Sequence, residues 1–253
     1  VGTECDWSGV TCSSGSVSAI SMRANNLIGS IPSELGNIAG LKDLRLDDNS
    51  LSGSIPAELG NLKPLTALRL DNNSLSGSIP AELGNLKNLT FLTLNGNSLS
   101  GSIPAELGNL TNLTGLFLTR NSLSGSLPAE LGKLTNLVSL FLGRNSLSGS
   151  IPAELANLTK LSELLLNNNT FSGPLPQSIL GLSLATLNTT DAFLAPVATI
   201  SNPSQISQIE RNALIALYNS TGGANWSKNT GWLGAVGTEC DWSGVTCSSG
   251  SVS

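Results

Sequence analysis

Residues 89–112 read LTFLTLNGNSLSGSIPAELGNLTN, and the pattern of this stretch recurs along most of the chain. The template is L-x-x-L-x-L-x-x-N-x-L-x-G-x-I-P-x-x-L-G-x-L-x-x, with a period of 24 residues. Its seven copies begin at Val17, Leu41, Leu65, Leu89, Leu113, Leu137 and Leu161. One unit of this length cannot bury its own leucines, whereas stacked units bury them against each other. The period therefore predicts a solenoid.

The local structure of one unit can be predicted from its residue types. Leu92 and Leu94 lie two positions apart, which places both on the inward face of a short strand. Gly101 permits a tight bend, and the apolar residues of SLSGSIP point inward. Pro104 begins a short helical turn, which we expect Gly108 to end.

An asparagine follows each predicted strand at the ninth position of the template. A polar side chain at a buried corner needs hydrogen-bond partners, and the backbone of neighbouring loops can supply them. We expect a structural asparagine ladder from Asn25, Asn49, Asn73, Asn97, Asn121, Asn145 and Asn169.

The repeat resembles the leucine-rich repeat, in the x-G-x-I-P form found in plant receptor-like kinase ectodomains and polygalacturonase-inhibiting proteins. The resemblance covers about residues 1–187 and again 205–253. It implies an α/β-type solenoid, a right-handed superhelix with a parallel β-sheet on the concave side and short 3-10 or helical turns on the convex side. In this family the L-x-G-x-I-P segment forms a second short sheet, and the ectodomains are extracellular recognition modules.

The same eighteen residues, VGTECDWSGVTCSSGSVS, stand at 1–18 and at 236–253. They contain all four cysteines, Cys5, Cys12, Cys240 and Cys247, in two C-x6-C pairs. The chain has no histidine and no C-x2-C spacing, so disulfides are favoured over a metal site. Disulfides indicate an oxidising compartment. The segment also resembles the second half of the family's N-terminal cap, in which such a cysteine pair would staple the cap.

The predicted organisation splits this cap between the two chain ends. Residues 1–16 are its second half, 17–183 hold the repeats, 184–204 are a degenerate last rung and linker, and 205–253 resemble the whole cap. The last segment is expected to be a C-terminal helical cap fragment in which Trp226, Trp232 and Trp242 would cover a first rung. The duplication fits either a tandem array or an artificial overlap of the ends. Head-to-tail self-association through the split cap is a further expectation.

The outward positions of the predicted sheet hold the candidate ligand-binding residues. One zone is aromatic and arginine-rich, with Phe91, Phe117, Arg120, Phe141, Arg144 and Leu165. An exposed aromatic cluster with arginine at its edge is typical of a site that binds a protein or peptide. The alternative is that these rings only shield one another on the sheet.

A second zone, in the first half of the repeats, alternates Arg45 and Arg69 with Asp43, Asp47, Asp48 and Asp71. Both arginines are kept as candidate ligand-binding residues, although a self-satisfied ion network is the favoured interpretation. Calcium at the aspartates is a weaker alternative.

Regular serine columns suggest a different function. Their members are Ser50, Ser74, Ser98, Ser122 and Ser146; Ser52, Ser76, Ser100, Ser124, Ser148 and Ser172; and Ser54, Ser78, Ser102, Ser126 and Ser150. Evenly spaced hydroxyl groups on a solenoid can order water, so an ice-binding or structural surface is the alternative function. Recent duplication of solvated residues would also explain them.

Composition excludes several classes of function. The net charge of −5 argues against nucleic acid and anionic membranes as partners, and no apolar run is long enough to span a membrane. Without histidine, a Ser-His-Asp or Cys-His site is impossible, and no phosphate-binding loop occurs. We therefore expect no enzyme, no cofactor and no metal, and an extracellular or cell-surface recognition module.

Overall fold

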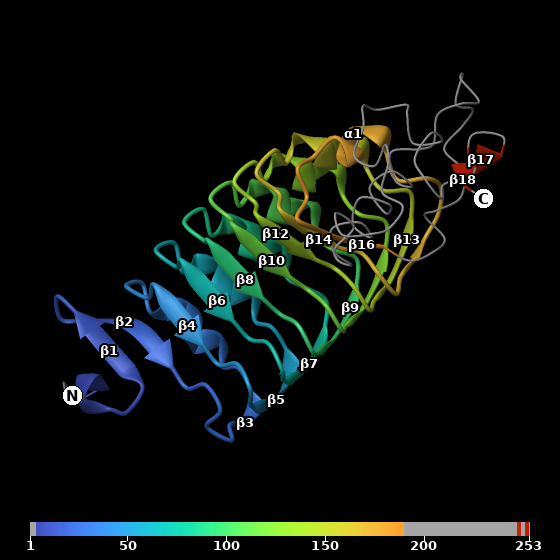
Figure 1. Cartoon of the computed structure of the whole chain (residues 1–253). Coiled ribbons are helices and arrows are strands. Elements are labelled where there is room, and N and C mark those ends of the chain that lie inside the picture. Colours follow the sequence, from blue (N-terminus) through green and yellow to red (C-terminus); the bar gives the residue numbers. More distant parts are fainter. Residues whose placement is uncertain (1–3, 190–246, 249–250, 253) are drawn as a thin grey trace, which may run out of the picture. The chain divides into compact units, whose positions relative to one another are not determined.

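The computed structural model describes residues 4–189, 247–248 and 251–252. The chain forms two compact units, Val1–Phe193 and Leu194–Ser253, which are treated separately below. Within the first unit, the repeats stack one on the next as successive rungs of a solenoid (Figure 1). The predicted fold class is thus confirmed.

A nine-stranded sheet, called the main sheet below, forms one side of the solenoid. Its strands in spatial order are β1 (Val10–Ser13), β2 (Ser16–Ser21), β4 (Asp43–Arg45), β6 (Ala67–Arg69), β8 (Phe91–Thr93), β10 (Gly115–Phe117), β12 (Ser139–Phe141), β14 (Glu163–Leu165) and β16 (Thr186–Asn188). All neighbours are parallel except β1 and β2, which form an antiparallel hairpin. Equivalent residues of successive repeats face each other, as Leu92 faces Leu68 and Leu116. The first strand of the main sheet, β1, is therefore antiparallel to the strands of the repeats, which the period does not predict.

A second sheet has seven short strands, five of which contain an S-L-S-G segment. Its strands are β3 (Ile28–Ser30), β5 (Ser50–Ser54), β7 (Ser74–Gly77), β9 (Ser98–Gly101), β11 (Ser122–Gly125), β13 (Ser146–Gly149) and β15 (Thr170–Phe171). The chain turns at Gly101, the last residue of β9, whose φ of +75° lies in the left-handed region. A glycine at this position of every repeat therefore sets the bend.

Short 3-10 helices return the chain to the main sheet. They are η2 (Ser33–Asn37), η3 (Ala57–Asn61), η4 (Ala81–Asn85), η5 (Ala105–Asn109), η6 (Ala129–Lys133) and η7 (Ala153–Asn157); η1 (Glu4–Asp6) and one α-helical turn, α1 (Gln177–Leu180), complete the helices described. Pro104 directly precedes η5 with an extended backbone, φ −64° and ψ 134°. The expectation that Gly108 ends the turn is wrong, because η5 continues through Gly108 to Asn109.

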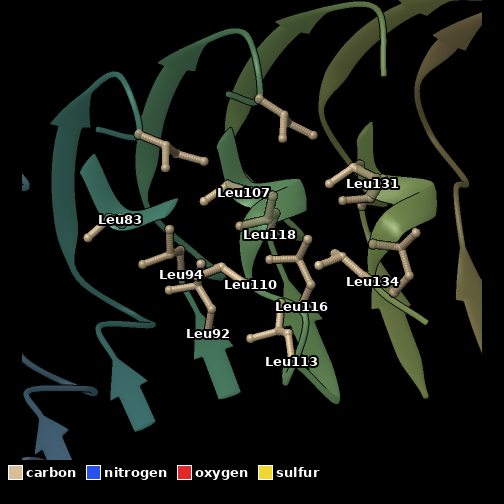
Figure 2. Close-up of a cluster of buried hydrophobic side chains, with 14 of the residues drawn as sticks. Leu83, Leu92, Leu94, Leu107, Leu110, Leu113, Leu116, Leu118, Leu131 and Leu134 are labelled. Carbon is tan, nitrogen blue, oxygen red and sulfur yellow. The ribbon is translucent and has the colours of Figure 1, made fainter. Parts of the chain in front are cut away.

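The core is a column of leucines between the main sheet and the 3-10 helices (Figure 2). Leu92, Leu94 and Leu99 have no exposed surface, and Ile103 is 3% exposed. Equivalent leucines lie opposite one another on paired strands, as Leu68, Leu92 and Leu116 do, so the core has the period of the sequence. This burial is the main source of the solenoid's stability.

Asparagines at the ninth position connect successive rungs. The Asn97 Oδ1 accepts from Leu75 N at 2.9 Å, and its Nδ2 donates to Leu70 O at 3.0 Å and Leu94 O at 3.1 Å. The same type of bonding is made by Asn49, Asn73, Asn121, Asn145 and Asn169. Asn25 differs: it is exposed, and its Nδ2 lies 3.8 Å from the Met22 sulfur. The strand next to β2 at this end of the sheet is β1 of the hairpin and not a strand of another repeat. Asn25 therefore lacks the backbone groups of a preceding repeat to which the other asparagines donate.

The duplicated segment adopts the same pairing in both units. In the first unit Cys12 faces Val17 and Ser13 faces Ser16, and a disulfide joins Cys5 to Cys12. In the second unit, β17 (Cys247–Ser248) pairs with β18 (Ser251–Val252) in the equivalent antiparallel register. The expected helix, Trp226, Trp232, Trp242, Cys240 and the pairing of Cys240 with Cys247 lie outside the described residues.

The last described rung is shorter by one residue. Leu187 in β16 faces Leu164 in β14, a step of 23 residues where the other repeats step by 24. Leu184 is half-buried against the core, while Leu187 is 40% exposed. The core leucines thus give way to partly exposed residues at this end of the sheet.

Candidate ligand-binding face

Three phenylalanines from adjacent strands gather on the outer face of the main sheet. Phe91 is 40% exposed, while Phe117 and Phe141 are half-buried. The rings of Phe117 and Phe141 pack edge to face, with centroids 4.9 Å apart and an interplanar angle of 89°. Neighbouring rings therefore shield one another, and the aromatic surface still reaches solvent at Phe91.

Gly115 makes room for this cluster, although the sequence did not single it out. A Cβ on Gly115 would lie 2.4 Å from Phe117 Cε2 and 3.2 Å from Phe91 Cδ1. The two rings thus lie over the bare backbone of β10. The only sequence signal was a glycine in a column of outward positions that otherwise carry side chains.

Leu165 lies next to the aromatic cluster on the sheet, and two arginines follow the strands that carry Phe117 and Phe141. Leu165 in β14 faces Phe141 across the sheet and is half-buried. Arg120 and Arg144 follow their strands at the eighth position of the template and are exposed. Their φ values of +58° and +57° lie in the left-handed region, which favours glycine and asparagine over arginine. The repeat geometry imposes this conformation, since Asp48 and other residues of the same column share it.

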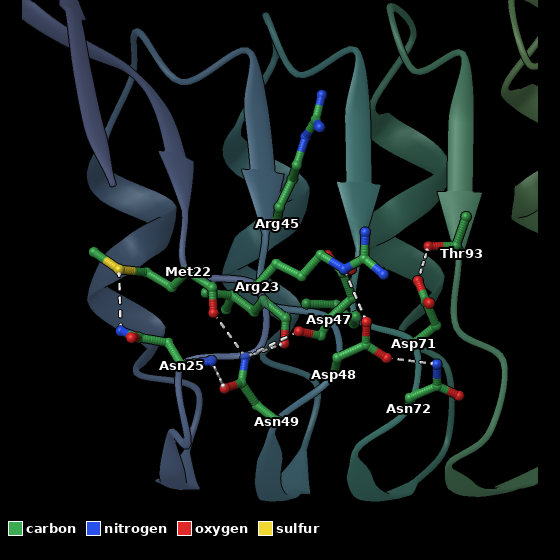
Figure 3. A network of polar contacts seen from close by, with 12 residues as sticks. Met22, Arg23, Asn25, Arg45, Asp47, Asp48, Asn49, Asp71, Asn72 and Thr93 are labelled. Atoms are coloured by element: carbon green, nitrogen blue, oxygen red, sulfur yellow. Dashed lines mark hydrogen bonds and ion pairs between the residues drawn. The ribbon is translucent and has the colours of Figure 1, made fainter. Parts of the chain in front are cut away.

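Two arginines make three ion pairs in the charged zone, and Figure 3 shows Arg23 beside Asp47 and Asp48. Arg45 binds Asp43 with both Nε and Nη2, the latter at 2.7 Å, and this hydrogen bond and charge raise the pKa of Arg45. Arg23 was not among the predicted site residues. Its Nε lies 2.8 Å from Asp48 Oδ2 and 3.1 Å from Asp47 Oδ2.

Arg69 stands apart from these ion pairs. Its Cζ lies 5.7 Å from the centroid of the Phe91 ring, a cation–π contact. Among the described residues it forms no ion pair, and its buried Nε has no hydrogen-bond partner. Arg69 therefore connects the charged zone to the aromatic cluster, a contact that neither zone's sequence pattern indicated.

A pocket of about 330 Å³, called the junction pocket below, opens where the two zones meet. Its lining comprises Arg23, Asp47, Arg69, Asp71, Phe91, Thr93, Asn95 and Phe117. The template places Asp47 outward, yet it is only 6% exposed and its Oδ1 has no hydrogen-bond partner in the described structure. Burial and the nearby Asp71 carboxylate raise the pKa of Asp47. Asp71 accepts a hydrogen bond from the Thr93 hydroxyl (Figure 3).

The serine columns lie on the second sheet, away from this face. Ser74 faces Ser52 and Ser98 faces Ser76, and the first two columns are exposed throughout except for the half-buried Ser148. The third column is also exposed, and several of its members, including Ser54, line a groove of about 1660 Å³ beside the 3-10 helices. All three columns therefore present hydroxyl groups to solvent.

Two features are absent from the described residues, a metal-binding group and a membrane-spanning helix. Across residues 4–189, no group of three or more acidic or cysteine side chains is arranged to hold a metal ion. None of the described helices has the length and apolar character needed to cross a membrane.

Comparisons with known proteins agree with the repeat structure. The family model described as a leucine-rich repeat region matches residues 23–208. Among solved structures, a TDR receptor is 40% identical with a TM-score of 0.63, covering 64% of this chain and 28% of its own. The plant peptide hormone receptor RGFR1 in complex with RGF2 is 36% identical with a TM-score of 0.61, covering 66% of this chain and 31% of its own.

A plant ice-binding protein is also similar, at 29% identity and a TM-score of 0.60, covering 74% of this chain and 77% of its own. The chain spans less than a third of either receptor structure, but about three quarters of the ice-binding protein. Among curated protein sequences, none matches the chain. The family match and the stacked rungs together show that this chain belongs to the leucine-rich repeat proteins, in the plant-type form of the repeat.

Proposed function

We propose that the main sheet is a non-catalytic recognition surface that binds a protein or peptide ligand. The observation that carries this proposal is the cluster of Phe91, Phe117 and Phe141 on the outer face of three adjacent strands. Partly exposed aromatic rings bordered by arginine are enriched at the centres of protein interfaces. Two similar structures support the proposal by their ligands: RGFR1 is a peptide hormone receptor bound to RGF2, and HAESA is bound to an IDA peptide hormone.

Alanine substitution in the cluster tests the binding site. Peptides selected from a random display library on the whole chain would serve as probes. Phe117→Ala and Phe141→Ala should each weaken binding about tenfold or more, because the edge-to-face pair is lost along with its contact area. Val138→Ala is the matched control, since Val138 has the same 40% exposure as Phe91 but lies outside the cluster. Unchanged affinity in both phenylalanine variants would refute the assignment.

An extracellular or cell-surface location belongs to the same proposal. The disulfide between Cys5 and Cys12 supports it, because such bonds persist in oxidising compartments. The receptor ectodomains among the similar structures also support an extracellular or cell-surface location. A thiol-reactive probe applied to denatured protein from its natural source should label Cys5 and Cys12 only after reduction. Labelling without reduction would contradict this location.

Ice binding is a second candidate function, favoured by the serine array and by the similarity to a plant ice-binding protein. Ser52, Ser76 and Ser100 recur once per strand and are exposed, and Ser74 and Ser98 lie opposite Ser52 and Ser76 on the neighbouring strands. If the array binds ice, Ser76→Lys should lower thermal hysteresis, because a long charged side chain disrupts the hydroxyl row. Glu106→Lys on η5 is the control. Wild-type protein without thermal hysteresis or ice shaping would eliminate this candidate.

Head-to-tail self-association is a third part of the proposal. The hairpin β17–β18 has the same pairing as β1–β2, so the duplicated segment carries the same local structure in both units. One copy could therefore take the other's place against a first repeat. Light scattering should show a mass that rises with protein concentration, and a constant monomer mass over a wide range would contradict association.

A further inference from the structure

The junction pocket contains two carboxylates with unused hydrogen-bonding capacity. Asp71 forms no ion pair with the described residues, and among them the one hydrogen-bond partner of its carboxylate is the neutral hydroxyl of Thr93. Asp47 is almost fully buried, and its Oδ1 has no partner there. A buried acceptor without a partner is energetically unfavourable, and a suitable donor would remove that cost.

The three nearby arginines do not meet this need. Arg45 is held by Asp43 through two nitrogens. Arg23 bridges Asp48 and one oxygen of Asp47 from an exposed position at the rim, where 66% of its side chain is accessible. Arg69 lies over the Phe91 ring. A cation supplied from outside would therefore find two acids with unused hydrogen-bonding capacity.

The remaining walls of the pocket suit a long side chain. Phe91 and Phe117 provide an apolar surface next to the acids, and Asn95 provides an amide. The volume of about 330 Å³ is at the lower end for small-molecule sites, which suits one side chain better than a folded segment. Lysine and arginine combine an apolar stem with a charged end, so they match both parts of this lining.

We propose that the junction pocket is a subsite for one lysine or arginine side chain of the peptide ligand. Its charged group binds Asp71 and Asp47, and its methylene stem packs against Phe91 and Phe117. This inference rests on the proposed recognition function and adds to it a requirement for a basic residue in the ligand.

Binding at this subsite should depend on pH. Arg23, Arg45, Asp48 and Asp71 supply the charges that act on Asp47, and burial with the Asp71 charge raises its pKa. A bound cation favours the ionised carboxylate. Affinity should therefore increase as pH rises through the pKa of Asp47 and level off above it.

The direct test uses two small probes on the whole chain, followed by NMR titration. N-acetyl-arginine methylamide carries the proposed charge, and the citrulline analogue has nearly the same shape without it. The arginine probe should bind at least about tenfold more tightly, a difference of about 1.4 kcal/mol. Asp71→Asn should remove this preference. Asp43→Asn should keep it, because Asp43 pairs with Arg45 outside the pocket.

Several results would overturn the subsite. These are equal binding of the two probes, no binding of either at tens of millimolar, tighter binding of N-acetyl-glutamate methylamide, or an arginine preference that survives Asp71→Asn. The comparison of probes on the wild-type chain remains decisive if a variant fails to fold. Displayed peptides separate the two proposals. If they need Phe117 but bind the Asp71→Asn and Asp43→Asn variants equally, the subsite fails while the recognition function stands.

Discussion

At the scale of single residues, the asparagine column shows how one side chain can hold two rungs together. Asn97 bonds the backbone at Leu70 O and Leu94 O, which directly follow β6 and β8, and at Leu75 N within β7. The Asn97 amide gives these backbone groups a partner, and a buried unpaired group is costly. The amide supplies both a donor and an acceptor, which explains why asparagine and no other residue fills the column.

Replacing Asn97 with alanine should therefore destabilise the chain strongly. We expect a loss of about 3 kcal/mol in the free energy of unfolding, because buried backbone groups on two rungs lose their partners. Urea denaturation measures this quantity. Asn25→Ala is the control from the same column, and it should cost less than about 0.5 kcal/mol because Asn25 is exposed. Similar losses for the two variants would disprove the role of burial.

Asp47 should show a pH dependence opposite to that of its neighbour Asp48. The folded state raises the pKa of Asp47 above the ordinary value of 3.8, mainly by burial. Ionisation of Asp47 therefore destabilises the fold above the raised pKa, and this penalty disappears as pH falls below the ordinary value. Asp47→Asn should raise the midpoint of urea unfolding at about pH 7, with no gain at about pH 3.

Asp48→Asn serves as the control with the reverse sign. Hydrogen bonds from Asn72 and Arg23 lower the pKa of Asp48, so its ionised form stabilises the fold above the ordinary value and the benefit is lost as pH falls. This variant should lower the midpoint at about pH 7. If both variants shift stability in the same direction at neutral pH, burial is not the main cause of the raised pKa of Asp47.

At the scale of elements, the 3-10 helices stack so closely that their glycines have no room for a side chain. A Cβ on Gly108 would lie 2.3 Å from Glu130 O and 2.7 Å from its carbonyl carbon. Glycine is thus required by close approach between η5 and η6. Ala156 fills the same template position in η7, whose neighbour is the α-helical turn α1 and not another 3-10 helix.

Gly108→Ala should therefore force the two helices apart. Overpacking of this kind costs about 1–3 kcal/mol, which thermal unfolding followed by circular dichroism would detect. Gly181→Ala is the matched control, because a Cβ there would lie 3.4 Å from Ser178 O, at the edge of ordinary contact. That substitution should change stability by less than about 0.5 kcal/mol. Equal effects would show that stacking does not require the glycine.

At the scale of the whole solenoid, each rung contacts only its neighbours. Stability is then a sum of contributions from rungs and interfaces, and damage at one end weakens the adjacent rungs most. The β1–β2 hairpin is the first element on the main sheet, and its disulfide closes it between Cys5 and Cys12. This end of the stack therefore depends on a covalent bond that the repeats do not have.

A chain with Cys5→Ser and Cys12→Ser should open locally at the hairpin. The lost cross-link should destabilise this region by about 2–3 kcal/mol. Hydrogen exchange should speed up at backbone amides of β1 and β2, while the amides of β10 and β12 keep their rates. The control is Ser13→Ala, which leaves the disulfide intact. Uniformly faster exchange along the solenoid would instead show that the rungs unfold as one unit.

Much of this molecule could be predicted from its period. Leu92, Leu94, Asn97 and Gly101 have the roles that their spacing indicated, because every rung repeats the same backbone and the same neighbours. The position of Phe91, Phe117 and Phe141 on one face follows from the same rule. Repeating units convert sequence spacing directly into spatial neighbourhood, so the sequence alone determined the rungs, their register and the residues on each face.

Only the tertiary structure decided how side chains on that face pair with one another. Asp47 is outward in the template yet buried, Arg69 lies on Phe91 and not on an aspartate, and Gly115 accommodates the ring of Phe117. These contacts depend on the rotamers of long side chains and on packing between residues about 24 positions apart. The repeat fixes the backbone position from which each side chain projects, whereas the neighbouring side chains determine its rotamer and its contacts.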